Sequence, residues 1–205
     1  MLSTRSSGIL LHPTSLPGQF GSGDFGINSF KFVDWLVSAG QTVWQILPLG
    51  EVGPGNSPYM SSSAFAGNIL LIDLEWLVKQ GWLEAEDLLP VPEFKSERVD
   101  YELLKPYRMG KLRLAAQRFL SKRNHRKRAA YVEFCSKEKH WLDDYVLFNA
   151  VGQHEAGGDW SEWPQELVRR DPQALEAARL RYANEIEFWK FCQWCFAQQW
   201  FELKD

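Results

Sequence analysis

The stretch from Gly53 to Asn68 holds the side chains with the clearest capacity for chemistry in this sequence. It contains several serine hydroxyls, two asparagine amides and two aromatic rings, Tyr59 and Phe65, but almost no aliphatic side chain. Hydroxyls and amides form the hydrogen bonds that recognise sugars, and an aromatic ring can stack on a pyranose. The composition therefore indicates sugar binding. The same residues also fit an ordered connection whose serines hydrogen-bond to their own backbone.

Two carboxylates, Asp143 and Asp144, stand next to each other inside a helical pattern. Glycosidic chemistry needs two carboxyl groups that face each other across about 5–10 Å, and these normally come from separate elements. Neighbours on a helix point about 100° apart, so they cannot converge on one bond. We interpret both aspartates as structural.

Cys192 and Cys195 have the spacing of a redox or zinc motif. They lie in the middle of a helical pattern, without a second Cys or His pair that would complete four ligands. Two small apolar residues on a packed helix are the better interpretation, and we expect no metal site and no cofactor.

Two further features have a structural and a functional interpretation. The basic run Lys122–Arg128 resembles a nucleic-acid patch, but in an acidic chain a solvated turn between helices is favoured. His12 ends an apolar run, where a hydrogen-bonded structural histidine is typical and a substrate contact stays open. Phosphate-binding glycine motifs and a G-x-S-x-G serine motif are absent from the sequence.

Two apolar runs flank a helical pattern in the first part of the chain. Gly8–His12 and Thr42–Leu47 predict strands, and the first is apolar on both faces, as a buried parallel sheet requires. Between them Asn28 or Ser29 can cap a helix that Gly40 ends. The expected apolar face of this helix comprises Phe30, Val33, Trp35, Leu36 and Val37. Strand, helix and strand form a βαβ unit with parallel strands, and ligands meet such folds at the loops after the strands.

The remainder of the chain is predicted to be mainly helical. Ile69–Ile72 favours a short extended piece, and Asp73 can cap a helix that runs to about Gln80. Glu84–Glu97 is acidic and broken by two prolines, which indicates a linker. Further helices are expected over the ranges Asp100–Ser121, Arg126–Lys139, Trp141–Gln153 and Asp171–Leu203. We therefore expect one domain over residues 1–80 and a helical one over 81–205.

Composition narrows the class of protein. The 205 residues are 45% apolar, enough for a hydrophobic core, and the formal charge of -3 provides no field that would recruit nucleic acid or an anionic membrane. Three cysteines, an odd number, indicate a reducing compartment, and no apolar stretch approaches the ~18 residues of a membrane span. We expect a cytoplasmic protein.

Several motifs, in order along the chain, resemble the 4-α-glucanotransferases, also called amylomaltases or disproportionating enzymes. The similarity is carried by the segments Gly8–Gly18, Trp44–Gly50, Asn56–Asn68, Trp141–Phe148, Arg170–Leu175 and Glu185–Trp200. It implies the N-terminal part of a (β/α)8 TIM barrel, an α/β fold, with a large helical subdomain inserted after strand two. Members of this family are enzymes of carbohydrate metabolism that act on starch and glycogen. They transfer α-1,4-glucan segments between maltooligosaccharides or to glucose.

The resemblance also implies a retaining mechanism with three carboxylates, an Asp nucleophile, a Glu acid/base and a second Asp. All three are expected beyond Asp205, so no catalytic residue maps onto this chain and the isolated chain is predicted to be inactive. Tyr59 resembles the tyrosine that stacks under the sugar, and Ser57 a hydrogen-bonding group beside it. Asn68 and His12 match the family pattern and are interpreted as shaping the loops. The expected partner is a maltooligosaccharide, not nucleic acid or a membrane.

Three alternatives stay open. The chain could be a truncated glucan-binding fragment without catalysis, or part of a related α-amylase-type hydrolase, which would share the barrel and the retaining chemistry. It could also be an independent helical interaction protein whose basic Lys122–Arg128 turn meets a partner.

Overall fold

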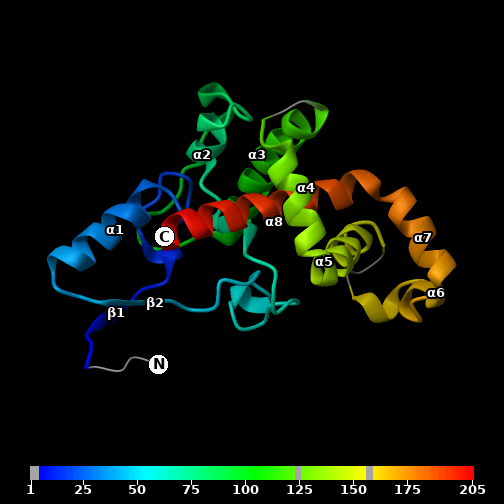
Figure 1. The fold of residues 1–205 in the computed structure, drawn as a ribbon, viewed down its shortest axis with the longest axis horizontal. Helices are drawn as coiled ribbons and strands as arrows, with labels where there is room; N and C mark the ends of the chain where they lie inside the picture. The colour runs from blue at the N-terminus through cyan, green and yellow to red at the C-terminus, as the bar shows by residue number, and fades with distance from the viewer. Residues whose placement is uncertain (1–4, 123–125, 156–158) are drawn as a thin grey trace. The chain divides into compact units, whose positions relative to one another are not determined.

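The computed structural model describes residues 5–122, 126–155 and 159–205. It contains two compact units. The first comprises Met1–Phe119 together with Cys195–Asp205, and the second comprises Leu120–Trp194. Figure 1 shows the order of the elements along the chain. None of the helices in the described ranges has the length and apolar character needed to cross a membrane.

The first unit begins with the predicted βαβ arrangement. Strand β1 (Gly8–Leu10) pairs in parallel with β2 (Val43–Gln45), and α1 (Ile27–Ser38) connects them (Figure 1). The register places Ile9 opposite Trp44. This confirms the parallel pair, although both strands are shorter than the apolar runs that predicted them.

The expectation that the first strand is buried on both faces is wrong for this structure. Leu10 is 57% exposed, and Val37 on α1 is 70% exposed. Of the apolar residues expected to form the inner face of α1, only Leu36 is fully buried. A two-stranded sheet has no further strands to cover its edges and faces, so these side chains stay open.

The start of α1 also differs from the prediction. Its N-cap is Gly26, and neither Asn28 nor Ser29 caps it. Both side chains are instead used by the preceding loop: Asn28 Nδ2 donates to the carbonyl of Pro17 at 2.8 Å, and Ser29 Oγ donates to that of Asp24 at 2.5 Å. Gly40 has a φ of +68°, consistent with its predicted role at the end of the helix.

The segment before α2 is helical rather than extended. Ile69–Leu71 forms a 3-10 helix, because the buried Asn68 Oδ1 accepts a hydrogen bond from the Leu70 amide at 3.0 Å and starts the turn. Helix α2 (Leu74–Lys79) then begins as predicted. Asp73 accepts hydrogen bonds from the amides of Glu75 and Trp76, at 2.9 and 3.1 Å.

Helix α3 (Tyr101–Ser121) carries the most deeply buried charge of the first unit. Arg108 has no solvent exposure, and its guanidinium donates to the carbonyls of Phe20, Ser22 and Ile72 at 3.3, 3.5 and 2.9 Å. It also forms an ion pair of 2.7 Å with Asp24. A buried cation is tolerated only when acceptors replace its lost hydration, and this set does so.

The predicted linker is anchored along α3. Ala85–Leu88 forms a 3-10 helix, and Arg118 of α3 pairs with Asp87, with one N–O distance of 3.1 Å. Tyr107 Oη donates to the carbonyl of Leu88 at 2.6 Å. The predicted linker is thus fastened to α3 and is not a free connection. We call residues 85–99, which precede α3, the strap.

The last turns of α8 (Ala183–Lys204) return to the first unit. Phe196 and Trp200 lie 5.3 and 5.5 Å from the ring of Phe25. Gln199 Oε1 accepts a hydrogen bond of 2.7 Å from the Asp73 amide, and its Nε2 donates back to the Asp73 carbonyl at 3.3 Å. These contacts close the core around the start of α2.

Helices are the only regular secondary structure among the described residues of the second unit. It contains α4 (Arg128–Lys137), α5 (Lys139–Gly152), α6 (Gln165–Val168), α7 (Pro172–Arg181) and the first part of α8. The prediction of one helix over Asp171–Leu203 is wrong, because the chain leaves helical geometry at Tyr182, where φ is -105° and ψ is 23°. The cap at Asp171 is confirmed by hydrogen bonds from the Gln173 and Ala174 amides.

Both aspartates of α5 have structural partners, as interpreted from the sequence. Asp143 lies 3.3 Å from Lys190, and Asp144 lies 2.8 Å from Arg170. Cys192 and Cys195 are fully buried on α8, which agrees with their interpretation as packed helix residues. Of the basic run at 122–128, residues 123–125 lie outside the described part of the chain.

Replacing Arg108 tests whether its buried guanidinium organises the first unit. Arg108→Met removes the cation but leaves Asp24 and three carbonyls without their donor, so the free energy of unfolding should fall by about 3 kcal/mol or more. Urea denaturation measures this change. The exposed Arg169→Met serves as the matched control and should change it by less than about 0.5 kcal/mol. Equal, small effects of both substitutions would show that Arg108 has no such role.

Asp73 makes stability depend on pH. Its burial, reinforced by the nearby Asp24, raises the pKa of the Asp73 carboxyl from its ordinary 3.8 to about 6. Between these values the folded protein binds more protons than the unfolded chain, so the contribution of Asp73 to stability decreases as the pH rises. Asp73→Asn keeps a capping side chain but cannot ionise. Relative to the unsubstituted protein, it should therefore gain about 2–3 kcal/mol between pH 4 and pH 7. A difference between the two proteins that does not change with pH contradicts the raised pKa.

Candidate functional site

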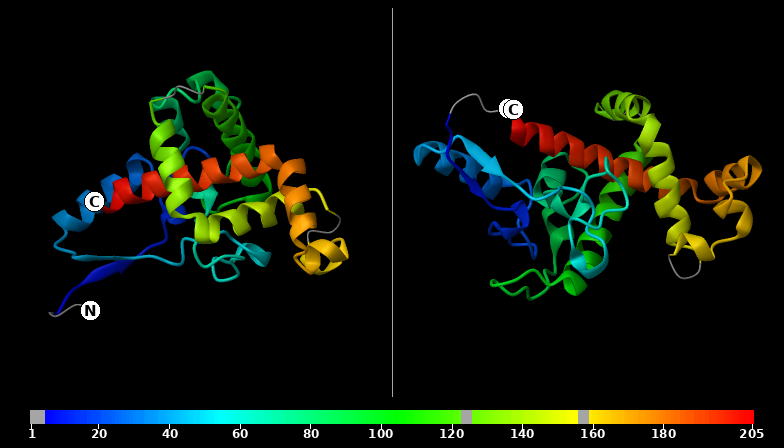
Figure 2. Two further views of the ribbon diagram at one scale, coloured as in Figure 1. Left: turned by 45° about the vertical axis from the view of Figure 1, so that its right-hand side comes forward. Right: turned by 90° about the horizontal axis from the view of Figure 1, so that it is seen from below.

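The loops that follow β1 and β2 meet at their far ends. The amide of Phe25, at the end of the first loop, donates to the carbonyl of Leu71 at 2.9 Å. The second loop is closed by a bridge between Gly50 and Gly67 and by a hydrogen bond of 2.7 Å from the Asn68 amide to the Leu49 carbonyl. Figure 2 follows the chain from β2 into this second loop in two views. Both loops at the carboxyl ends of the strands are therefore anchored to one segment, Asn68–Asp73.

The loop from Gly53 to Asn68 is held in shape by its own backbone. The Gly53 amide donates to the Ser57 carbonyl at 3.1 Å, and the Asn56 amide donates to the Gly53 carbonyl at 2.9 Å. Gly55 has a φ of +68°, which favours glycine. At Gly53, an added Cβ would lie 2.0 Å from the carbonyl oxygen of Met60, so only glycine allows this approach. The loop is a defined structure that can present side chains at fixed places.

The serines of this loop hydrogen-bond largely to its own backbone. Ser57 Oγ accepts from the Tyr59 amide at 3.3 Å, and Ser61 Oγ donates to the Ser63 carbonyl at 2.9 Å. Ser63 Oγ accepts from the amides of Phe65 and Ala66, at 3.2 and 3.1 Å. The alternative of an ordered connection with self-satisfied serines is thus confirmed for these three. Since a hydroxyl both donates and accepts, Ser57 still has its proton to donate to a ligand.

Tyr59 presents its ring to solvent. The residue is 70% exposed, and among the described residues its hydroxyl has no hydrogen-bond partner. Met60 and Phe65, on the same loop, are also exposed. An exposed phenol on an ordered loop offers an apolar face for stacking and a hydroxyl for a hydrogen bond. The geometry leaves Tyr59 available for a ligand, and it brings Ser57 next to it through the backbone.

His12 and Asn68 shape the loops. Asn68 is buried and starts the 3-10 helix described above. The carbonyl of His12 accepts from the Ser15 amide at 2.9 Å, and burial lowers the pKa of its imidazole, which disfavours the charged form. Within the described part of the chain, the buried His12 Nδ1 has no hydrogen-bond partner. The hydrogen-bonded histidine that is typical of such a strand end is therefore not found at this atom.

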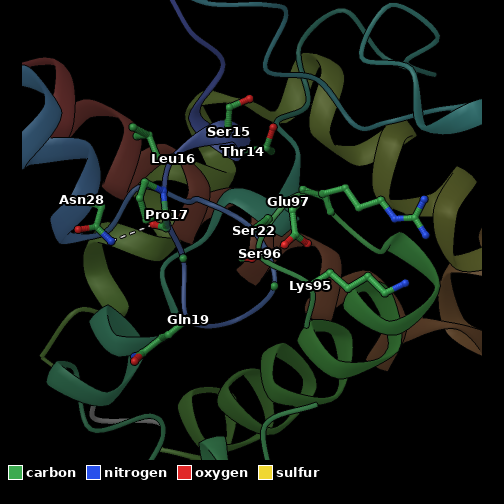
Figure 3. A pocket seen from close by; sticks show the side chains of 14 residues that line it. Thr14, Ser15, Leu16, Pro17, Gln19, Ser22, Asn28, Lys95, Ser96 and Glu97 are labelled. Carbon is green, nitrogen blue, oxygen red and sulfur yellow. Dashed lines mark hydrogen bonds between the residues drawn. The ribbon is translucent and has the colours of Figure 1, made fainter. Parts of the chain in front are cut away.

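A cavity of about 690 Å³ lies beside the first loop (Figure 3). One part of its lining comes from the loop after β1 and the start of α1, and the other from the strap before α3. The lining residues are Thr14, Ser15, Leu16, Pro17, Gly18, Gln19, Gly21, Ser22, Asn28, Lys95, Ser96, Glu97, Arg98 and Val99. Sequence reasoning missed this cavity, because it assigned the strap to a linker. The signal that the sequence offered was Phe94, the one aromatic residue in the stretch Glu84–Glu97.

Titratable residues that could hold a metal do not gather in the first loops. Across the described ranges, no group of three or more His, Cys, Asp or Glu side chains is arranged to bind an ion. What the site offers is hydrogen bonding, an exposed aromatic ring and, in the cavity, two cations.

The fold and these loops place the chain in the class of parallel α/β proteins with long, polar loops at the carboxyl ends of their strands. More specifically, the chain belongs to the 4-alpha-glucanotransferase family, whose model matches residues 11–205.

Relatives in this family align along the whole chain. The 4-alpha-glucanotransferase of Synechocystis is 42% identical over 204 residues, which cover 100% of this chain and 40% of that protein. The enzyme of Thermus thermophilus is 44% identical over 200 residues, or 98% of this chain and 39% of the relative. The amylomaltase from Streptococcus agalactiae, solved in complex with acarbose, superposes with a TM-score of 0.92 at 38% identity. The superposition covers 98% of this chain and 40% of the amylomaltase chain.

The chain therefore spans about 40% of the length of the relatives it matches, and corresponds to their N-terminal portion.

Proposed function

We propose that this protein is the N-terminal part of a cytosolic 4-α-glucanotransferase, which transfers α-1,4-glucan segments between maltooligosaccharides or to glucose. Family membership supports the activity, and the exposed Tyr59 on an ordered loop supports the sugar contact. An odd number of cysteines, three, is consistent with a reducing compartment. The single observation that carries the proposal is the match of the whole chain to these transferases at about 40% identity.

The proposed architecture is a (β/α)8 barrel whose first two strands are β1 and β2. Residues 1–80 would form the first βα units with their loops, and residues 81–205 a helical subdomain inserted after the second strand. The open faces of β1 and α1 support a larger barrel, because apolar side chains such as Leu10 and Val37 need further strands and helices to cover them. In such barrels the loops after the strands bind the substrate.

In the proposed site, Tyr59 stacks against a pyranose ring at the point of cleavage. Its hydroxyl would join the hydrogen-bond network of the sugar, and the ring face would exclude water from one side of it. Ser57 would donate a hydrogen bond from its hydroxyl to the sugar. Its Oγ would still accept the hydrogen bond of 3.3 Å from the Tyr59 amide. Neither side chain has to move far, since the loop already holds both.

The transfer itself needs carboxylates that these residues do not supply. We propose a retaining double displacement, in which an Asp attacks the anomeric carbon, a Glu protonates the leaving oxygen, and a second Asp stabilises the transition state. The glycosyl group then passes to the hydroxyl of an acceptor sugar, and the Glu takes up its proton. Asp143 and Asp144 are engaged by Lys190 and Arg170, which argues against a catalytic role. The three carboxylates are assigned to the remaining length of the relatives.

Substituting Tyr59 tests the sugar contact. Tyr59→Ala should weaken maltooligosaccharide binding about tenfold, since stacking on an aromatic ring contributes about 1 kcal/mol or more. Tyr59→Phe keeps the ring and should stay within about threefold of the unsubstituted protein. Isothermal titration calorimetry with maltoheptaose measures both.

A matched control keeps this test specific. Leu180→Ala removes an equally exposed apolar side chain from the second unit and should leave the affinity unchanged. Equal losses in Tyr59→Ala and Leu180→Ala, or no loss in either, would exclude Tyr59 as a sugar contact.

The assignment of the carboxylates is tested with the 205 residues by themselves. Purified alone, they should release no glucose from maltotriose above the background of a heat-denatured sample of the same protein. They should still bind maltooligosaccharide through Tyr59. Disproportionation above that background contradicts the assignment, because the catalytic groups would then have to lie within these residues.

A further inference from the structure

The cavity beside the first loop has walls that are fixed by buried contacts. Arg108 donates to the carbonyls of Phe20 and Ser22, and so holds the stretch of loop that forms one side of the cavity. Asn28 Nδ2 donates to the Pro17 carbonyl at 2.8 Å and fixes the next part of the same wall. Figure 3 shows this hydrogen bond and the lining side chains. The space is thus part of the folded structure and not a gap between loosely placed segments.

The opposite wall is fastened by an aromatic contact. Gly21 lies against the ring of Phe94, where an added Cβ would be only 2.7 Å from a ring carbon. Phe94 in turn meets Tyr107 of α3 edge-on, with ring centroids 5.9 Å apart, and Tyr107 stacks on Phe20 at 6.3 Å. This contact brings the last part of the strap, Lys95–Val99, against the loop after β1. Gly21 has a φ of +88°, so both its conformation and its lack of a side chain are required here.

The lining is rich in hydrogen-bonding groups and contains no aromatic ring. Thr14, Ser15, Ser22 and Ser96 contribute hydroxyls, and Gln19 and Asn28 contribute amides. Ser22 is itself buried, and among the described residues its Oγ has no hydrogen-bond partner. Such a lining suits the hydroxyl groups of a polyol. Without an aromatic ring, it does not offer the stacking surface that a neutral pyranose or a nucleobase usually finds.

The charges on the strap favour an anion. Lys95 and Arg98 are exposed and, within the described part of the chain, neither forms an ion pair. The one carboxylate between them, Glu97, accepts a hydrogen bond of 3.0 Å from Ser96 Oγ. Arginine and lysine are the side chains that bind phosphate, and their long, flexible stems can reach a group at the mouth of the cavity.

We propose that this cavity binds a phosphorylated sugar. Lys95 and Arg98 contact its phosphate, and the hydroxyls and amides of the loop contact its sugar hydroxyls. A volume of about 690 Å³ is ample for a hexose phosphate. Neither Tyr59 nor Ser57 lines the cavity, so this site goes beyond the proposed glucan contact and does not depend on it.

Titration calorimetry with three separate ligands tests the proposal: glucose 1-phosphate, inorganic phosphate and maltose. In the purified protein, glucose 1-phosphate should bind saturably and at least about tenfold more tightly than inorganic phosphate, since only the sugar phosphate uses both halves of the lining. The double variant Lys95→Ala/Arg98→Ala should lose at least about tenfold in affinity for it. Tyr59→Ala should bind it unchanged.

A control double variant, Lys79→Ala/Arg169→Ala, removes one exposed lysine and one exposed arginine that do not line the cavity and should leave the affinity unchanged. The proposal is overturned if glucose 1-phosphate shows no saturable binding. It is also overturned if inorganic phosphate binds as tightly as the sugar phosphate, or if both double variants lose affinity equally. Binding of maltose that is lost in Lys95→Ala/Arg98→Ala would instead identify a neutral glucan subsite and would also overturn it.

Discussion

The buried guanidinium of Arg108 is the interaction on which the first unit depends. A cation without solvent exposure must recover its hydration from protein atoms, and Arg108 does so from three carbonyls and the carboxylate of Asp24. These acceptors belong to the loop after β1 and to the residue that precedes Asp73. One side chain of α3 thereby ties that loop to the start of α2, the same segment that closes the loop after β2.

This arrangement explains how a small, exposed pair of strands can present ordered loops. Phe25 bonds to Leu71, and Asn68 bonds to Leu49, so each loop is fixed at the end furthest from its strand. The last turns of α8 complete the support through Gln199, which hydrogen-bonds to both backbone groups of Asp73. The loops therefore have a rigid base while Tyr59 remains at the surface. Under the proposed function, rigid placement of the Tyr59 ring would help catalysis, because catalysis depends on holding the substrate in one geometry.

Local signals in the sequence predicted the elements whose cause is local. The caps at Asp73 and Asp171 and the glycine at position 40 each act through their own backbone neighbours. Two other features were not predicted, although the first has a local cause. The Asn68 side chain turns an apolar run into a 3-10 helix through a hydrogen bond from the Leu70 amide. An apolar stripe continues across the break at Tyr182, although the helix does not.

In the candidate site, features with a local signal in the sequence can be separated from features with a distant cause. A family resemblance and a polar loop composition led to the prediction of Tyr59 and Ser57 as sugar contacts, which stays a prediction. The cavity and its anchor, Arg108, required the fold, because residues 86 positions apart or more, such as Ser22 and Arg108, come together only in three dimensions. The stretch Glu84–Glu97 was predicted as a linker for the same reason, because Phe94 packs against Gly21, which is far away in the sequence.

The most direct measurement of the central claim is a crystal structure of the protein with a bound maltooligosaccharide. The account predicts a pyranose ring lying face to face with Tyr59, and Ser57 Oγ within hydrogen-bond distance of a sugar hydroxyl. It also predicts that the loop after β2 keeps the backbone hydrogen bonds described here. A sugar bound elsewhere, with the Tyr59 ring left in solvent, would contradict it.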